Sequence, residues 1–428
     1  MPRRPAGRFA SCLRVAGLAA LLVLVLAGPA AAGPPGTGFR RGVGVHTMLN
    51  WARTNPERTA YLPAPFDGPS YDLPEATIRN VAAAGFDFVR LTVDPGPFLQ
   101  LDGAARDALD RHLAATVRRF LAAGLAVLVN LHPNSQVAAY NPVRWLVSTE
   151  DPTYRAFLAL VGRTARVLAA IGSPAVAFEP LNEPPYGYDP ASVRRWQAMC
   201  EAMHAEARAA APDMLLVLTG ARGGSRQGLL ALDPAPFRAS RVRFSFHYYE
   251  PYAFTHQGVP ASEGDAASWR YFSGMPYPAG SVPAALVLDG VSATVAAAPG
   301  LDPLARRRAL AQARERASAY LATRFGPSDI AVAFDEVRDW AVRNGIEPDR
   351  ILLGEFGATR TYGRYRASDP VSYEAWLSDT REAAERRGFA WALWVLGGTG
   401  GMALVSEDGA TSLDRGTLRA LGLRTEAP

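Results

Sequence analysis

Short apolar runs alternate with longer stretches of helical periodicity along most of the chain. The short runs are rich in Val, Leu, Ala and Phe, which is typical of strands buried on both faces of a parallel sheet. Eight such runs occur, and eight parallel strands close a barrel. The predicted strands are Gly42–His46, Phe88–Val93, Ala126–Leu131, Ala175–Leu181, Met214–Leu218, Val242–Tyr248, Ile351–Glu355 and Phe389–Val395. The pattern therefore predicts an α/β protein, a (β/α)8 TIM barrel in a single domain over residues 42–425.

Helix boundary signals support this order of elements. The amphipathic stretch Leu73–Ala84 stops at Gly85, a residue that favours the end of a helix. Asp302-Pro303 supplies a cap and a first-turn proline for a helix over Leu304–Phe325.

Two segments depart from the rhythm. Residues 33–41 are rich in Gly and Pro and are interpreted as a short leader before the first strand. Residues 257–301 form a long region predicted to be irregular, an enlarged loop after strand 6. Long loops in compact domains are usually functional, and this one would lie on the face where barrel active sites occur.

Residues 1–32 have the order of an export signal. Four arginines precede an apolar run from Val15 to Leu26, and small residues follow up to Ala32. We expect cleavage after Ala32, a secreted or periplasmic mature chain, and no membrane insertion of that chain, because no other run approaches the length of a spanning helix.

Charge and cysteine content narrow the chemistry. The sequence contains no lysine, so all 45 basic residues are arginine, which excludes Schiff-base catalysis and a P-loop lysine. The formal charge of +5 falls to +1 without the four arginines of residues 1–32, and no nucleic-acid partner is expected. Cys200 would be alone in the mature chain, which leaves no internal disulfide, and we expect it to be a buried thiol.

Two glutamates stand at the ends of predicted strands. Glu183 lies in Leu181-Asn182-Glu183-Pro184, and Glu355 lies in Gly354-Glu355-Phe356-Gly357. Cleavage of a glycosidic bond needs one carboxylic acid to protonate the leaving oxygen and one carboxylate across the sugar ring. Strand ends of a barrel meet at one rim, so we expect the two carboxyl groups to converge there, about 5 to 5.5 Å apart if stereochemistry is retained.

Arg90 is a charged residue inside an apolar strand and therefore needs a carboxylate partner. A purely structural ion pair would use Glu179. A functional arrangement would place Arg90 beside Glu355 and hold that carboxylate ionised.

Aromatic and imidazole side chains also fall at strand ends. His132 follows the third run, and His247 and Tyr249 are two residues apart, so both can face one pocket. Trp394, in the eighth run, is either a core residue or a platform for a sugar ring.

Together these residues resemble, in type and chain order, the eight that mark glycoside hydrolase family 5, the cellulase-like family. They are Arg90, His132, Asn182, Glu183, His247, Tyr249, Glu355 and Trp394. The resemblance runs from Gly42 to Trp394 and implies a TIM barrel, a retaining double displacement, and neither metal nor other cofactor.

The resemblance also implies a role for each position. Glu183 would be the acid/base and Glu355 the nucleophile. The supporting residues would be Asn182 on the 2-hydroxyl, Tyr249 and Arg90 on Glu355, His132 and His247 along the cleaved subsite, and Trp394 stacked on the sugar.

The distance along the chain between Tyr249 and Glu355 is larger than is common in this family, because of the region after strand 6. Its aromatic residues are expected to wall one end of the cleft: Tyr252, Phe254, Trp269, Tyr271 and Tyr277. Trp51, Tyr186 and Trp269 are candidates, with Trp394, for stacking on sugars, and plain loop or core packing is the alternative for the first three. The segment from Tyr249 to Gly258 resembles, more loosely, bacterial members associated with polysaccharide production and processing.

Two alternatives of another class stay open. A metal-dependent barrel hydrolase would draw on His46, His132, His247 and Glu355, although no His-x-His pair closes a strand. A carbohydrate-binding barrel without turnover is the other.

The expected substrate is a polysaccharide or oligosaccharide. An endo-β-1,4-glucanase is our first expectation, with β-1,3-glucan, mannan or an exopolysaccharide as alternatives, because loop shape decides among them. The sequence leaves the oligomeric state open.

Overall fold

The computed structural model describes residues 38–185, 187, 189–261, 264–363, 365–398, 401–406 and 409–426. The predicted export signal and most of the 33–41 leader lie outside the described residues. Within the described ranges, no helix has both the length and the apolar character needed to cross a membrane.

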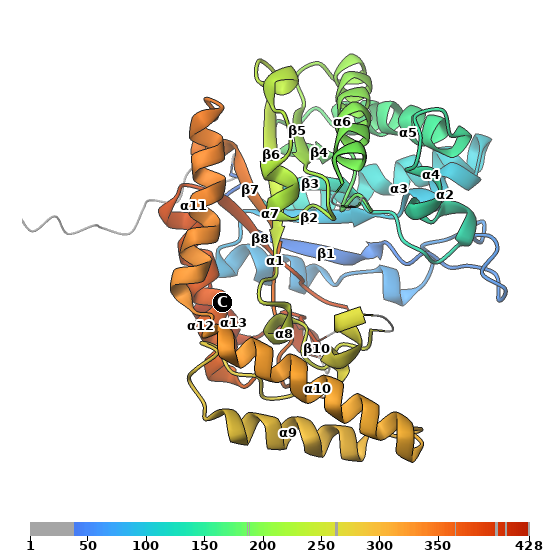
Figure 1. Cartoon of the computed structure of the whole chain (residues 1–428). Coiled ribbons are helices and arrows are strands. Elements are labelled where there is room, and N and C mark those ends of the chain that lie inside the picture. Colours follow the sequence, from blue (N-terminus) through green and yellow to red (C-terminus); the bar gives the residue numbers. More distant parts are fainter. Residues whose placement is uncertain are drawn as a thin grey trace, which may run out of the picture. The chain divides into compact units, whose positions relative to one another are not determined.

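Eight parallel strands close into a barrel in sequence order, which confirms the predicted TIM barrel (Figure 1). They are β1 (Arg41–Leu49), β2 (Phe88–Val93), β3 (Ala126–Leu131), β4 (Val176–Glu179), β5 (Leu215–Thr219), β6 (Val242–Tyr248), β7 (Ile351–Phe356) and β8 (Ala390–Leu393). The fourth and eighth strands are shorter than predicted, since the apolar runs continue into the loops that follow them. A two-stranded hairpin, β9 (Val405–Ser406) and β10 (Gly409–Leu413), follows the barrel.

Alternate residues of each strand fill the barrel interior in layers. An apolar layer that includes Phe88, Leu128, Ala177 and Leu352 plugs one end. Two residues further along β2, the period of a strand places Arg90 in the next layer, and that layer is polar. The centre of the barrel interior is therefore charged, and an apolar layer of side chains closes the barrel on one side of it.

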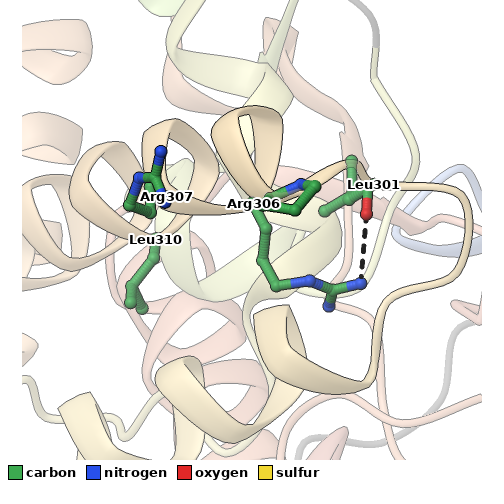
Figure 2. A pocket seen from close by; sticks show the side chains of 5 residues that line it. Leu301, Arg306, Arg307 and Leu310 are labelled. Atoms are coloured by element: carbon green, nitrogen blue, oxygen red, sulfur yellow. Dashed lines mark hydrogen bonds between the residues drawn. The ribbon is translucent and has the colours of Figure 1, made fainter.

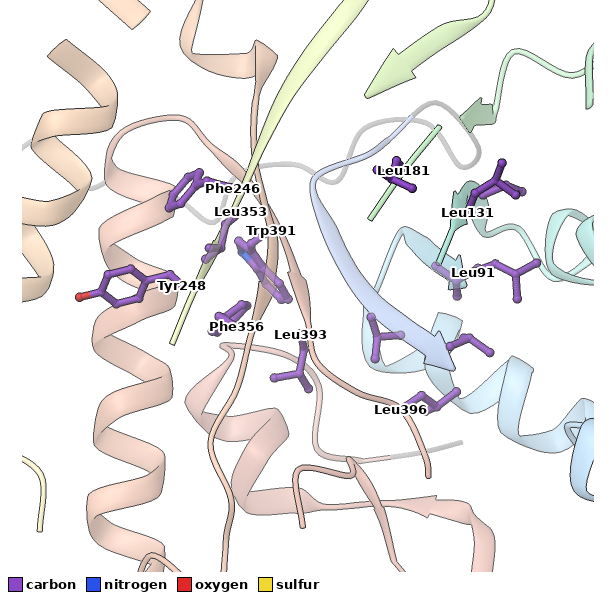
Figure 3. Close-up of a cluster of buried hydrophobic side chains, with 14 of the residues drawn as sticks. Leu91, Leu131, Leu181, Phe246, Tyr248, Leu353, Phe356, Trp391, Leu393 and Leu396 are labelled. Atoms are coloured by element: carbon purple, nitrogen blue, oxygen red, sulfur yellow. The ribbon is translucent and has the colours of Figure 1, made fainter. Parts of the chain in front are cut away.

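The outward-facing strand residues pack against the surrounding helices. Figure 3 shows part of this core, where Phe246 and Tyr248 of β6 gather with Phe356 of β7 and Trp391 of β8. Tyr248 stacks parallel to Trp376, with ring centroids 6.5 Å apart. Helices and strands are thus joined by one continuous apolar cluster.

The helices that follow the strands are α1 (Glu75–Ala84), α3 (Gly103–Ala122), α5 (Pro152–Ala169), α6 (Pro190–Ala210), α7 (Arg226–Leu230), α11 (Pro327–Arg343), α12 (Pro370–Arg386) and α13 (Arg415–Ala420). The remaining α-helices are α2 (Pro95–Gln100), α4 (Pro142–Trp145), α8 (Tyr252–Thr255), α9 (Ala284–Ala297) and α10 (Pro303–Thr323). Short 3-10 helices are η1 (Pro69–Tyr71), η2 (Ala138–Tyr140), η3 (Ala235–Phe237), η4 (Gly264–Tyr271) and η5 (Pro348–Arg350). The predicted boundary signals operate: Gly85 ends α1 in the left-handed conformation, and the Asp302 side chain caps α10.

The region 257–301, the insertion after β6, was predicted to be irregular, and that prediction was wrong, because the region contains η4 and α9. Helix α9 is apolar on most of its surface, so it shows no clear polar face in the sequence, and it buries only the stripe Val287, Val291 and Val295. It packs beside α10 (Figure 1). The guanidinium of Arg306 in α10 donates to carbonyl groups at the end of α9, those of Val295 and Ala298. It also donates to the carbonyl of Leu301 (Figure 2). An arginine thus caps a helix that has no polar C-cap of its own.

Cys200 lies on the buried face of α6, with 1% of its surface exposed. Burial raises the pKa of its thiol, so the thiol is unreactive as expected.

Candidate active site

A β-bulge sets the direction of Glu355 on β7. His247 lies opposite Glu355, but the pairing before it is one residue out of step, so Gly354 is an extra residue. Leu352 faces the barrel interior, and without the extra residue the period of the strand would turn Glu355 outward. A Cβ atom on Gly354 would lie 2.3 Å from Oγ of Ser245, so no side chain fits at the bulge.

Arg90 is completely buried at the centre of the barrel and binds three neighbours. Its Nη1 donates to Oε1 of Glu355 at 2.6 Å, and its Nε donates to Oε2 of Glu179 at 2.7 Å. Nη2 donates to Oδ1 of Asn182 at 2.7 Å. Burial opposes the charge, but the two carboxylates outweigh it and raise the pKa of Arg90. Arg90 therefore forms both of the ion pairs considered from the sequence, the structural one with Glu179 and the functional one with Glu355.

The second oxygen of Glu355 faces Tyr249 and His247. The Tyr249 hydroxyl donates to Oε2 of Glu355 at 2.8 Å. Burial raises the pKa of Tyr249, and the charges of Glu355 and Glu183 raise it further, so the phenol keeps its proton and stays a donor. Nδ1 of His247 lies 2.7 Å from Oε1 of Glu183 and 3.6 Å from Oε2 of Glu355.

His247 is the residue that links the two glutamates. Burial alone would lower its pKa, but the nearby carboxylates of Glu355 and Glu183 overcome this and raise it. Protonated Nδ1 then donates to Glu183. One ligand-capable atom from each of the three residues lies within 4.8 Å of the others, so the carboxyl groups converge on one site.

The two glutamates differ in their surroundings. The side chain of Glu183 is 40% exposed, and its described hydrogen bond is to His247. The side chain of Glu355 is 6% exposed and accepts from Arg90 and Tyr249. One carboxyl group is therefore open to solvent, whereas the other is fixed in a buried cradle of donors.

Asn182 and His132 form a chain of fixed polarity. Arg90 can only donate, so the amide oxygen of Asn182 must face it and the amide nitrogen must face His132. Nε2 of His132 then accepts at 3.3 Å, and its Nδ1 donates to Oδ1 of Asn130 at 3.0 Å. Burial, together with the charges nearby, lowers the pKa of His132 well below its usual value, which agrees with this neutral form.

Trp394 lies at the same site and not in the core. Its ring stacks on His132, with centroids 5.7 Å apart and planes 12° apart. It also meets His46 edge-on at 4.7 Å. Nε1 of Trp51 donates to Nε2 of His46 at 2.7 Å, and 51% of the Trp51 surface is exposed. These four rings form an aromatic surface that continues from Trp394 to Trp51.

A polar cluster beside this surface was not predicted from the sequence. Nδ2 of Asn134 donates to Oδ1 of Asn50 and to Oδ2 of Asp94, both at 3.1 Å. Burial raises the pKa of Asp94 to about 6. The three residues follow β1, β2 and β3. Their position could have been recognised in the sequence, because each is a polar residue after a strand end.

The aromatic residues after β6 divide into two groups. Phe254 and Tyr277 are 0% and 2% exposed, so the expectation that they wall the cleft was wrong. Their rings pack against each other, with centroids 5.7 Å apart, and the Tyr277 hydroxyl donates to Oδ2 of Asp379. Tyr252 and Trp269 are stacked on each other, and Tyr252 lies 6.5 Å from Tyr249 between ring centroids. Tyr271 is half-buried against the core, and Tyr186 lies outside the described residues.

Glu183, His247 and Glu355 could offer three ligand atoms to a metal ion. Both oxygens of Glu355 already accept from Arg90 and Tyr249, and the fixed charge of Arg90 opposes a second cation. These three residues are therefore better suited to catalysis by two carboxyl groups than to binding a metal ion. His46 and His132, the other expected ligands, contact Trp394 instead.

A separate pocket at the start of α10 is lined by Leu301, Pro303, Arg306, Arg307 and Leu310 (Figure 2). Arg306 is already bound to backbone carbonyls there. This pocket lacks the paired carboxyl groups of the barrel site.

The chain is similar to several known proteins. Cellodextrinase A of Ruminococcus flavefaciens is 27% identical over 187 residues, which cover 43% of this chain and 54% of that protein, so the chain matches about half of that relative's length. The fold is similar to the cellulose synthase subunit Z of Clostridioides difficile, with TM-score 0.60, 21% identity, and coverage of 89% of this chain and 99% of that one.

Two further solved structures share the fold. Thermotoga maritima Cel5A in complex with cellobiose has TM-score 0.60 and 20% identity, covering 90% of this chain and 97% of that one. A Bacteroides ovatus GH5 xyloglucanase has TM-score 0.62 and 16% identity, covering 90% and 74%. The family model for cellulase (glycosyl hydrolase family 5) matches residues 52–400, most of the chain. The chain belongs to glycosyl hydrolase family 5.

Proposed function

We propose that the protein is a retaining glycoside hydrolase in which Glu355 is the nucleophile and Glu183 the acid/base. The observation that carries the proposal is the unlike setting of two converging carboxyl groups, within 4.8 Å of each other at their nearest ligand atoms. Retaining enzymes hold the two groups about 5 to 5.5 Å apart, whereas inverting enzymes leave about 6.5 to 9.5 Å for a water molecule.

In the first step, Glu355 attacks the anomeric carbon while Glu183 gives a proton to the leaving oxygen. Arg90 and Tyr249 hold the Glu355 carboxylate in place and ionised, since each donates to one of its oxygens. In the second step, Glu183 takes a proton from water, which attacks the glycosyl ester. Its exposure supports both roles, because a leaving group and a water molecule can reach it.

The supporting residues follow from the same contacts. The amide nitrogen of Asn182 binds the 2-hydroxyl of the sugar, with its orientation fixed by Arg90. His247 hydrogen-bonds Glu183, and His132 backs the ring of Trp394, on which the sugar stacks.

The substrate we propose is a β-1,4-glucan cleaved internally by a secreted protein. The aromatic surface from Trp394 to Trp51 supports a chain of several sugars, and the order of residues 1–32 supports export. A panel of defined oligosaccharides, with products sized by mass, tests linkage and cleavage mode together.

Substitution of each glutamate tests the roles. Glu355→Ala should abolish turnover on all substrates. Glu183→Ala should lose about 10² to 10⁴-fold on substrates with poor leaving groups and far less on activated aryl glycosides. Glu374→Gln removes a carboxylate bound to Arg419 on the protein surface and serves as the control. Equal, mild losses in both glutamate variants would contradict the assignment.

A second candidate is a glucanase that serves polysaccharide production. The segment from Tyr249 to Gly258 and the similarity to cellulose synthase subunit Z support it. An exopolysaccharide preferred over soluble β-1,4-glucan in the same panel would favour this candidate. Absence of hydrolysis of any activated glycoside would favour a binding barrel instead.

A further inference from the structure

Four aromatic rings form a continuous cluster that begins at the proposed nucleophile. Tyr249, which donates to Glu355, lies 5.3 Å from His256 and 6.5 Å from Tyr252 between ring centroids. Tyr252 stacks on Trp269 at 5.7 Å, with ring planes 8° apart. His256 closes the cluster, 5.1 Å from each of Tyr252 and Trp269. All four come from the segment that begins at the end of β6.

The outer part of this cluster is accessible and uncharged. Tyr252 is 43% exposed, and Trp269 and His256 are half-buried. Burial lowers the pKa of His256 to about 4, so the imidazole is neutral at pH values well above 4. An exposed, neutral aromatic ring such as Tyr252 matches the C–H face of a pyranose ring, which binds by hydrophobic contact.

A buried polar network holds the cluster rigidly. The hydroxyl of Thr255 donates to the carbonyl of Tyr249 at 2.6 Å. Gln257 is fully buried, and its side chain donates to the carbonyl of Phe254 and accepts from the backbone of Met275. The hydroxyl of Thr359, in the loop after β7, donates to the carbonyl of Gln257 at 2.6 Å. A surface fixed in this way loses little conformational entropy when a ligand binds.

We propose that Tyr252 and Trp269 form a saccharide-binding subsite outside the bond-cleaving centre, which binds a further pyranose unit of the substrate chain. The inference rests on the proposed function and adds to it. Tyr249 connects the subsite to Glu355, so a sugar chain bound at the cleaved position can continue onto Tyr252. The aromatic surface from Trp394 to Trp51 is a separate group of rings at the site, and the two surfaces together suit a polymer better than a short glycoside.

Chain-length dependence tests the proposal. The test compares Tyr252→Ala and Trp269→Ala on an activated aryl glycoside and on β-linked oligosaccharides from disaccharide to hexasaccharide. We expect the ratio of kcat/KM for the hexasaccharide to that for the aryl glycoside to fall by about tenfold, the effect of one lost stacking contact. Tyr252→Phe keeps the ring and should keep the ratio.

Leu286→Ala is the matched control, because it removes an exposed apolar side chain from α9 of the same insertion. It should leave all rates unchanged. In the background of Glu355→Gln, calorimetry should show Tyr252→Ala weakening hexasaccharide binding by about the same factor. Thermal unfolding identifies any variant that fails to fold. Among the folded variants, the difference in hexasaccharide binding between Tyr252→Ala and Tyr252→Phe then tests the subsite.

An unchanged ratio in both alanine variants, with unchanged hexasaccharide binding, would overturn the subsite and leave the proposed function intact. Absence of hydrolysis by the unmodified protein on every substrate would overturn the proposed function. Weaker hexasaccharide binding in that case would still support a saccharide site at Tyr252.

Discussion

Tyr249→Phe removes one hydroxyl from the proposed nucleophile and leaves the ring in place. The lost bond is 2.8 Å long and joins two buried groups, since Tyr249 is 8% and Glu355 4% exposed. A hydrogen bond to a charged group contributes about 1.5 to 3 kcal/mol. If the bond positions the carboxylate for attack and its whole contribution is lost from the transition state, kcat/KM should fall by about 10- to 150-fold.

The neighbouring residue supplies the control. Tyr248 is also buried, but it faces Trp376 and Phe334, and its hydroxyl has no hydrogen-bond partner among the described residues. Tyr248→Phe therefore removes the same atom from the adjacent position without touching the site. It should keep kcat/KM, and its free energy of unfolding should be unchanged or higher.

The assay is steady-state hydrolysis of an activated aryl glycoside, with kcat and KM measured separately over a range of pH. The loss should appear in kcat/KM for Tyr249→Phe alone. If Tyr249→Phe loses no more than Tyr248→Phe, the donor cradle around Glu355 does not support the chemistry, and the assignment of the nucleophile fails.

Further predictions concern stability and metal. Glu179→Ala leaves the buried Arg90 with one carboxylate fewer and should cost about 3 to 5 kcal/mol, measured by urea unfolding. Burial lowers the pKa of His46 and of His256 from 6.5 to about 4, so between these values the unfolded chain binds protons that the folded chain does not. The contribution of each histidine to stability should therefore fall as pH drops from about 6.5 to 4, by up to about 3 kcal/mol, whereas Asp94, whose pKa burial raises to about 6, contributes in the opposite direction. A chelator should leave aryl-glycoside hydrolysis unchanged, since both oxygens of Glu355 are engaged.

Each of these has a control and a contrary outcome. Glu374→Ala breaks a surface ion pair with Arg419 and should lower the free energy of unfolding by less than about 1 kcal/mol. If Glu179→Ala lowers it by no more than this, the buried charge of Arg90 does not depend on Glu179. His256→Gln should flatten the acid slope, and a slope that stays the same would remove His256 as a cause. Loss of activity in chelator, restored by a divalent metal, would support the metal alternative.

The strands and the strand-end residues could be predicted from the sequence because both follow from local pattern. A continuous apolar run such as Phe88–Val93 marks a buried strand, and the closure of a parallel barrel brings residues after different strands to one rim. This is why Glu183 and Glu355, far apart in the chain, could be expected together. Seven of the eight residues of the family pattern lie at that rim, and Arg90 reaches Glu355 and Asn182 from within the barrel.

What escaped prediction depends on tertiary contacts. Helix α9 has no polar face for periodicity to reveal, and its cap comes from Arg306 on another helix. The same holds for Tyr277, since an aromatic residue in an insertion has the same sequence signature whether it is buried or exposed. The joint pairing of Arg90 with Glu179 and Glu355 required the layers of the barrel interior to be known.

The burial of Cys200 makes the protein suited to site-specific labelling. Its thiol is enclosed by α6 and its neighbours, and Cys12 falls within the predicted export signal. A cysteine introduced at an exposed position such as Leu286 would then react selectively with a maleimide dye. With residues 1–32 removed, the dye would be confined to that one position, without background from native thiols.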